Sequence, residues 1–327
     1  MRRWQKISAL LITIPTVLVL LGISIQAFAM SRDASRFPAM GEMVDVGGYK
    51  LHIHCQGEGS PAVIFDSGAG HWSYSWMHIQ AELSGQTRVC SHDRAGLGWS
   101  ELSPNEHDSA STAKDLHRLL NNTGIEAPFI LAGHSLGGAN IRVYTDMYPD
   151  DVAGLVLIES MHEEQWQRLP EEVFAYVESQ SKALPVAALM ARVGLLRLLP
   201  VDLPAPANIP EASRDAFTSF MLQSKTYKAL ASEMAQSPVS AAQTKAAQMS
   251  DDLPLAVVTA RRSFQAFEGL PMPLDASDKV WMELQKELVQ LTNTAKHFIS
   301  ETATHDINFD DPDSVIEAIK YVLEVAR

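Results

Sequence analysis

One five-residue segment, 133–137, has the residue types and spacing of a catalytic turn and reads Gly-His-Ser-Leu-Gly. It follows an apolar run at 129–132 that is typical of a buried strand, and it precedes a helical pattern at 138–147. A sharp strand-to-helix turn needs glycines around the serine, and it raises the serine hydroxyl above the sheet. The backbone N–H of Leu136, at the start of the helix, would then face a developing negative charge on oxygen. This context predicts Ser135 as a nucleophile, and the alternative is a glycine-rich turn with an idle serine.

Two further segments carry a resemblance to a known family. Residues 65–70 read Phe-Asp-Ser-Gly-Ala-Gly after a strand pattern, and residues 92–100 read His-Asp-Arg-Ala-Gly-Leu-Gly-Trp-Ser. Together with the serine turn, they resemble the α/β-hydrolase family over about residues 43–160 and 250–327. The resemblance implies a catalytic triad in the chain order serine, acid, histidine.

The resemblance also implies roles for residues outside the serine turn. By position, Ala69 is expected to donate a second backbone N–H to the oxyanion. Asp93 and Arg94 are expected to be structural and to fix loops beside the site. The family places the base after the last strand, and His305 follows a strand pattern at 297–300, so His305 is the predicted base.

The acid of the triad has a weaker signal. The family mostly places it after the strand predicted at 255–259, but the turn that follows there contains no carboxylate. The strand pattern at 154–159 ends in Glu159, a position that carries the acid in some α/β-hydrolases. Asp278 and Asp275 are the alternatives, although both lie near a helix start, where capping explains them equally well.

The remaining histidines have no catalytic context. His134 adjoins the nucleophile and is expected to point away from it, because neighbouring side chains on a tight turn diverge. His52 and His54 alternate along a strand and are expected to face solvent. No third ligand has the spacing of a metal site, so we expect neither a metal nor a cofactor.

The elements that must position these residues follow a regular order. Apolar runs of strand length alternate with helical patterns, which indicates an α/β fold with a mostly parallel sheet and helices on both faces. Strands are expected at 49–55, 62–66, 87–91, 129–132, 154–159, 255–259 and 297–300, and helices at 109–120, 138–147, 278–291 and 314–325. The expected parts are an anchor at 1–30, a linker at 31–42, core at 43–160, a cap between strands 6 and 7 at 161–250, and core at 251–327.

The cap contains an apolar stretch at 183–203. It is expected to line an apolar acyl pocket, with ordinary packing against the core as an equal alternative. A helix that lies on a membrane surface is a further alternative, for which only Arg192 and Arg197 supply positive charge.

The N-terminus has the composition of a membrane segment. Arg2, Arg3 and Lys6 precede 24 residues without charge, Ile7–Met30. A helix of that length spans the roughly 30 Å hydrocarbon core of a bilayer. This predicts a single-pass signal anchor with the catalytic domain outside the cytoplasm. The alternative is a signal peptide cleaved after Ala29, which would leave a secreted or periplasmic protein.

Composition excludes several classes of protein. The 327 residues are 46% hydrophobic, which supports a large core and rules out disorder. With 26 basic and 39 acidic residues, the net charge is −13, and the chain lacks the basic surface that nucleic-acid binding requires. Two cysteines, Cys55 and Cys90, exclude a disulfide scaffold, and either one bridge or two buried thiols are expected.

These observations favour a membrane-anchored serine hydrolase that cleaves carboxylic esters of small lipophilic substrates through an acyl-enzyme. The serine argues against the epoxide hydrolases and dehalogenases of the family, whose nucleophile is an aspartate. Hydrolysis of a carbon–carbon bond or a lactone by the same triad stays open. So does a non-catalytic binding protein with this fold.

Overall fold

The computed structural model describes residues 2–199, 209 and 211–327. Its eight strands are β1 Glu42–Asp45, β2 Lys50–Gln56, β3 Val63–Asp66, β4 Val89–His92, β5 Phe129–His134, β6 Val152–Ile158, β7 Leu255–Ala260 and β8 Lys296–Ser300. Its α-helices are α1 Arg2–Arg36, α2 Met77–Leu83, α3 Ser109–Thr123, α4 Leu136–Met147, α5 Gln165–Arg168, α6 Glu171–Arg192, α7 Glu211–Met221, α8 Ser224–Ala246, α9 Leu274–Leu288, α10 Ile307–Asp310 and α11 Pro312–Val325. Short 3₁₀ helices occupy Ser73–Trp76, Pro149–Asp151, Leu195–Arg197, Ser263–Phe267 and Val289–Leu291.

The strands form one sheet in the order β1-β2-β4-β3-β5-β6-β7-β8. β2 runs antiparallel to β1 and β4, and every other neighbouring pair is parallel. The predicted α/β class with a mostly parallel sheet is therefore confirmed, and all seven predicted strands belong to the sheet. The edge strand β1 was not predicted, because its four residues are too few to show a period.

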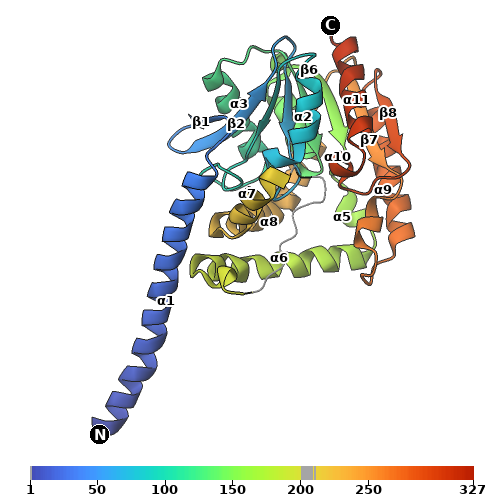
Figure 1. Ribbon diagram of the computed structural model, residues 1–327. Coiled ribbons are helices and arrows are strands. Elements are labelled where there is room, and N and C mark those ends of the chain that lie inside the picture. The colour runs from blue at the N-terminus through green and yellow to red at the C-terminus, as the bar shows by residue number, and fades with distance from the viewer. Residues whose placement is uncertain (1, 200–208, 210) are drawn as a thin grey trace.

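Helices cover both faces of the sheet, because alternate residues of each buried strand point to opposite sides. Leu131 of β5 packs in the cluster that includes α3 and α4. Its neighbours Ile130 and Ala132 pack in the cluster that includes α2 and α11. Figure 1 shows the resulting three layers, in which the sheet lies between helices.

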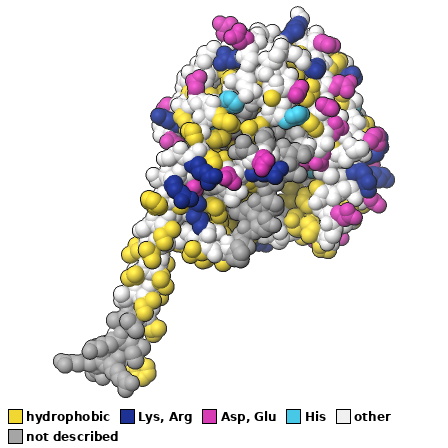
Figure 2. Space-filling model, viewed as in Figure 1, with side chains coloured by type: hydrophobic (Ala, Val, Ile, Leu, Met, Phe, Trp, Pro, Cys, Tyr) yellow, Lys and Arg dark blue, Asp and Glu magenta, His cyan; other side chains and the backbone are white. Residues whose placement is uncertain are grey.

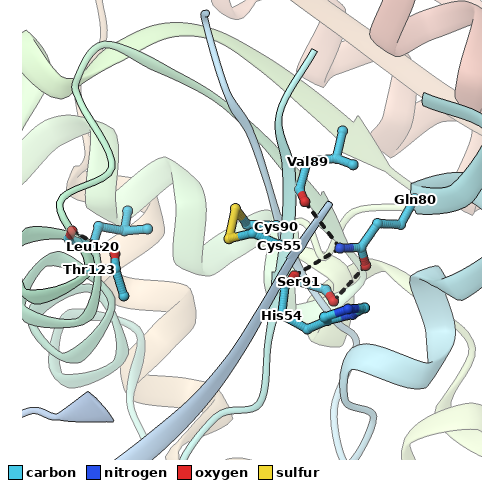
Figure 3. The surroundings of a disulfide bond; sticks show 8 residues. All are labelled: His54, Cys55, Gln80, Val89, Cys90, Ser91, Leu120 and Thr123. Carbon is cyan, nitrogen blue, oxygen red and sulfur yellow. Dashed lines mark hydrogen bonds between the residues drawn. A yellow bond between two sulfur atoms is a disulfide. The ribbon is translucent and has the colours of Figure 1, made fainter. Parts of the chain in front are cut away.

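Cys55 of β2 and Cys90 of β4 are register partners and form a disulfide. Of the two alternatives left open by the sequence, the structure contains the disulfide and not two buried thiols. Beside it, the Gln80 side chain of α2 donates a hydrogen bond to the Val89 carbonyl and accepts one from the Ser91 hydroxyl (Figure 3). The bridge joins β2 to β4, and the two hydrogen bonds hold α2 against β4.

The expectation that His52 faces solvent is wrong. His52 is fully buried, and its Nδ1 lies 3.0 Å from Oδ2 of Asp93. The loop after β4 covers this face of β2 and brings the Trp99 ring to 4.8 Å from the imidazole. His54, two residues further along, is half-buried.

The N-terminal helix α1 continues to Arg36, so residues 31–36 of the expected linker are helical. Its segment Leu11–Arg36 is long and apolar enough to cross a membrane. Figure 1 shows α1 leaving one edge of the body, with α6 lying crosswise to it. Helices α5 to α8 follow β6 and precede β7, the interval in which the cap was expected.

Candidate active site

Ser135 is the single residue between β5 and α4. Its backbone has φ 52° and ψ −118°, an arrangement that L-residues rarely adopt and that the surroundings must hold in place. The Ser135 N–H donates to the Ile158 carbonyl at 3.0 Å, and the Ser135 carbonyl accepts from the Met161 N–H at 2.9 Å. A side chain at Gly137 would collide with the Asp66 carbonyl, so the turn can pack against the β3 loop only with glycine there.

His305 lies in the loop between β8 and α10 and contacts both the serine and a carboxylate. Its Nε2 is 3.2 Å from Ser135 Oγ, and its Nδ1 is 3.0 Å from Glu159 Oε2. A carboxylate only accepts hydrogen bonds, so Nδ1 carries the proton and Nε2 is free to accept one from the serine hydroxyl.

Glu159 directly follows β6 and is fully buried, with φ 44°. Its Oε1 accepts from the Ala260 N–H at 2.7 Å, and its Oε2 accepts from Trp281 Nε1 at 3.0 Å as well as from His305. These donors compensate for the burial of the negative charge and fix the carboxylate against the imidazole.

The electrostatic surroundings act on His305 in two directions. Burial disfavours the imidazolium, but the hydrogen bond and negative charge of Glu159, together with the charge of Asp306, outweigh it and raise the pKa of His305. The carboxylate therefore stabilises the protonated imidazole, which is the form a base takes after it has accepted a proton.

The two alternative acids lie elsewhere. Asp278, in α9, accepts from the Phe264 N–H at 2.7 Å and from Gln265 Nε2 at 3.3 Å. Asp275 lies in the first turn of the same helix. The structure therefore brings Glu159 to His305, and it gives Asp278 a role in fixing the chain after β7.

Leu136 and Ala69, the two predicted backbone donors, line the same cavity as Ser135. Leu136 is the first residue of α4, so its N–H has no partner within the helix. Ala69 belongs to the loop after β3 and packs near Leu136. Both predicted donors therefore line the cavity that contains Ser135.

Arg94 forms hydrogen bonds with the residues that precede Ala69, and so fixes this loop as expected for the 92–100 segment. Its guanidinium donates to the Ser67 carbonyl at 2.5 Å, to the Gly68 carbonyl at 2.7 Å and to Asp66 Oδ1 at 2.5 Å. A fourth bond, at 2.8 Å, reaches Glu233 Oε1 in α8.

Glu233 is a residue that sequence reasoning missed. It is 1% exposed, and its Oε2 accepts from the Gly70 N–H at 2.8 Å, so it ties α8 to the Ala69 loop. Burial disfavours the charge of Arg94, but Glu233 and Asp66 outweigh this and raise the pKa of Arg94. The available signal was one carboxylate within the apolar stretch Leu230–Ala235, which is otherwise interrupted only by Ser232.

His134 does not point away from the site as expected. Its Nε2 lies 2.8 Å from the His305 carbonyl, and the two rings are 5.0 Å apart. Burial, and then the nearby His305, lower the pKa of His134 to about 3, so it is neutral at pH 7 and donates this bond. His134 thus fixes the backbone of the loop that carries His305.

A cavity of about 200 Å³ opens at Ser135 and His305. Its walls are mostly apolar and include Leu169, Val173, Met234, Phe264, Phe267 and Met272. A groove of about 910 Å³ lies next to the cavity, between α6 and α8, and four residues line both: Trp166, Val177, Met234 and Ser237. Of these, Trp166 Nε1 donates to Ser237 Oγ at 3.0 Å.

The expectation that the stretch 183–203 lines the acyl pocket is wrong for its described part. Residues 200–203 lie outside the described residues, and none of 183–199 lines the cavity. The first half of α6 does so instead, through Val173, Tyr176 and Val177. Among the described residues, no three His, Cys, Asp or Glu side chains lie close enough to hold a metal ion.

A serine on a strand–helix turn, a histidine after the last strand and a carboxylate at a strand end define, with this sheet, a class of α/β proteins. The model of the alpha/beta hydrolase fold family matches residues 61–199. The chain has the α/β-hydrolase fold.

Comparison with known proteins gives, among others, one curated relative and two solved structures with this fold. The chain is 26% identical over 319 residues to the Hormonema carpetanum protein "Probable transporter efuK", a match covering 86% of this chain and 42% of that protein. The chain thus spans less than half the length of this relative. A thermophilic esterase from Thermogutta terrifontis has a TM-score of 0.54 and 19% identity, with 87% of this chain and 97% of that chain covered. Haloalkane dehalogenase DatA from Agrobacterium tumefaciens C58 has a TM-score of 0.64 and 16% identity, with 87% and 96% covered.

Proposed function

We propose that this protein is a serine hydrolase of carboxylic esters, with Ser135 as nucleophile, His305 as base and Glu159 as acid. The observation that carries the proposal is the continuous chain of contacts from Ser135 Oγ through His305 to Glu159, at the wall of an apolar cavity. An aspartate nucleophile, as in the dehalogenases and epoxide hydrolases of the family, has no counterpart at this turn.

The proposed reaction has two halves. His305 takes the hydroxyl proton of Ser135, whose Oγ attacks the ester carbonyl, and the backbone N–H groups of Leu136 and Ala69 stabilise the oxyanion. His305 then protonates the departing alcohol, which leaves an acyl-enzyme. In the second half, His305 activates a water molecule that releases the acid and restores Ser135.

The cavity supports small lipophilic substrates. Apolar walls favour an apolar acyl or alcohol group, because its burial removes hydrocarbon surface from water. In this proposal, residues 161–250 form a lid over a core made of 43–160 and 251–327. Lactone opening and carbon–carbon hydrolysis use the same triad, so a substrate panel that includes both types of compound separates them from ester cleavage.

A fluorophosphonate probe tests the proposal directly, because it labels only an activated serine. We expect labelling of the native chain and none of Ser135→Ala. Ser237→Ala is the matched control, since that hydroxyl also lines the cavity without contacting His305, and it should keep its labelling. A native chain that is not labelled would favour the non-catalytic binding protein.

We also propose that α1 is a single-pass anchor with the catalytic domain outside the cytoplasm. Arg2, Arg3 and Lys6 precede the apolar span, which favours an N-terminus on the cytoplasmic side. The Cys55–Cys90 bridge supports an oxidising compartment. Protease added to intact cells should digest the domain, and mass spectrometry of the N-terminus distinguishes the anchor from cleavage after Ala29.

A further inference from the structure

The C-terminal half of α1 packs against the cap. A side chain at Gly22 would collide with the Val193 carbonyl, so the helix and the turn after α6 are in close backbone contact. Gln26, one turn further, is 3% exposed although it lies in the uncharged stretch. Its Nε2 donates to the Leu222 carbonyl at 2.8 Å, and its Oε1 accepts from Arg197 Nε at 2.7 Å.

Two ion pairs continue this contact towards the C-terminal end of α1. Arg197 Nη2 lies 2.6 Å from Asp33 Oδ2, and both side chains are largely buried. Arg36 Nη2 lies 2.6 Å from Asp215 Oδ2 of α7. Together with the bonds of Gln26, these pairs hold the helix to the cap at several successive turns. A flexible tether would leave the cap free to rotate relative to α1. This contact instead fixes the position of the cap along the axis of α1.

The height of the contact along α1 follows from helix geometry. Gly22 is 15 residues beyond Ile7, where the uncharged stretch begins, and this corresponds to about 22 Å along a helix. The hydrocarbon core of a bilayer is roughly 30 Å thick. With Ile7 at the inner boundary, the turn at Val193 and Gly194 therefore lies at the level of the outer leaflet.

Exposed apolar side chains surround this turn, and we call them the cap-tip surface: Val186, Leu189, Leu195, Leu198 and Leu199. Leu198 is 72% exposed and Leu189 is 60% exposed. Figure 2 shows apolar side chains along α1 and at the adjoining edge of the body, and α6 lies crosswise to α1 (Figure 1). Arg192, also exposed, can extend its charged end towards the water above them.

We propose that the cap-tip surface is seated in the outer leaflet of the same bilayer that α1 crosses. The occupant is lipid hydrocarbon, because the five side chains of this surface are apolar and continue the apolar surface of α1 at the level of the membrane, with Arg192 as the exposed charged residue beside them. This inference rests on the proposed anchor. Its consequence is that the groove between α6 and α8 lies close to the lipid surface, so lipophilic substrates reach it from the membrane.

Single-cysteine fluorescence tests the seating in the full chain. The two native cysteines are bonded to each other, so an introduced cysteine is the free thiol available for an environment-sensitive fluorophore. Leu198→Cys probes the cap tip, Leu18→Cys probes the anchor, and Glu324→Cys, exposed on α11, is the aqueous control. Each protein is reconstituted into phosphatidylcholine vesicles with and without lipids that carry a doxyl quencher in the acyl chain.

We expect blue-shifted emission and at least twofold quenching at positions 198 and 18, and neither effect at 324. Quenching at 18 without quenching at 198 overturns the seating and leaves the anchor intact. A blue shift at 198 without quenching also overturns it, because a second copy of the chain then covers the surface. No quenching at 18 overturns the anchor and the seating together.

A second substitution tests whether the contact between Gly22 and the turn after α6 sets the depth of the cap in the bilayer. Gly22→Leu separates α1 from the turn after α6 and should reduce the quenching at 198 while leaving that at 18 unchanged. Val19→Leu, at an exposed position one turn away, is the matched control and should change neither. Unchanged quenching at 198 in Gly22→Leu would contradict the proposed role of the helix–cap contact.

Discussion

Glu159 Oε2 lies 3.0 Å from His305 Nδ1, although 146 residues separate the two along the chain. The contact forms because β6 and β8 flank β7, so the residue after β6 and the loop after β8 meet at the same end of the sheet. The Trp281 indole and the Ala260 N–H also donate hydrogen bonds to the Glu159 carboxylate. The Glu159 carboxylate is thus held by elements from three separate parts of the sequence.

Glu159→Gln is expected to lower kcat/KM by roughly 10³- to 10⁴-fold, because an amide neither holds the right tautomer of His305 nor stabilises its imidazolium. The measurement is hydrolysis of p-nitrophenyl butyrate by folded variants. Asp278→Asn is the matched control and should stay within about threefold of the native value. A larger loss in Asp278→Asn than in Glu159→Gln would reverse the assignment of the acid.

The pH dependence should show the raised pKa of His305. The base must be neutral to act, so kcat/KM should rise with pH through a midpoint above about 6.5 and fall as the imidazole is protonated below it. Removing the negative charge in Glu159→Gln should move this midpoint to lower pH. A midpoint that is the same in both proteins would show that another group controls the acidic limb.

Glu233→Gln should impair catalysis through the Ala69 loop. The substitution removes one of the two carboxylates that pair with the buried Arg94. We expect the free energy of unfolding to fall by about 3 kcal/mol as a result. We expect kcat to fall at least tenfold with little change in KM, since in the proposed reaction the loop stabilises the oxyanion rather than the bound ester. Glu106→Gln is the control, because this exposed carboxylate lies in the loop before α3 and accepts from Gln236 of α8 without contacting Arg94. Unchanged kcat with reduced stability would make Glu233 purely structural.

Trp166→Ala should widen the chain-length range of the enzyme. The substitution opens the wall between the cavity and the groove between α6 and α8, so the ratio of activities on dodecanoyl and butanoyl esters should rise at least fivefold. Ser237→Ala removes only the hydrogen bond and should give a smaller rise. A decreased ratio in Trp166→Ala would mean that long chains bind elsewhere.

The double substitution Cys55→Ser and Cys90→Ser should lower the free energy of unfolding by about 2–4 kcal/mol, because the bridge limits the unfolded chain. Chemical denaturation with and without reductant measures this. The reductant should shift the native midpoint to that of the double variant and leave the variant unchanged. No shift in the native protein would indicate that the bridge contributes nothing to stability.

Local patterns in the sequence were sufficient to predict the α/β class, the strand-to-helix turn at Ser135 and the position of His305 after the last strand. The turn and each strand depend on a few consecutive residues, whose periodicity and glycine content restrict the backbone directly, and the α/β class follows from the order in which such patterns alternate. The choice between Glu159 and Asp278 could not be made in this way, because it depends on which strands are neighbours in the sheet. The burial of His52 was missed for a similar reason, since a loop 40 residues away covers it.

The sequence by itself therefore determined the chemical groups of this protein and the class of sheet that carries them. Only the tertiary structure brought Glu159 to His305, joined Glu233 of α8 to Arg94, and packed Gln26 of the N-terminal helix against Arg197. Such contacts join segments more than 100 residues apart, and their energy depends on packing and burial in the folded state. Hydrophobic periodicity is a property of one element and carries no information about its distant partners.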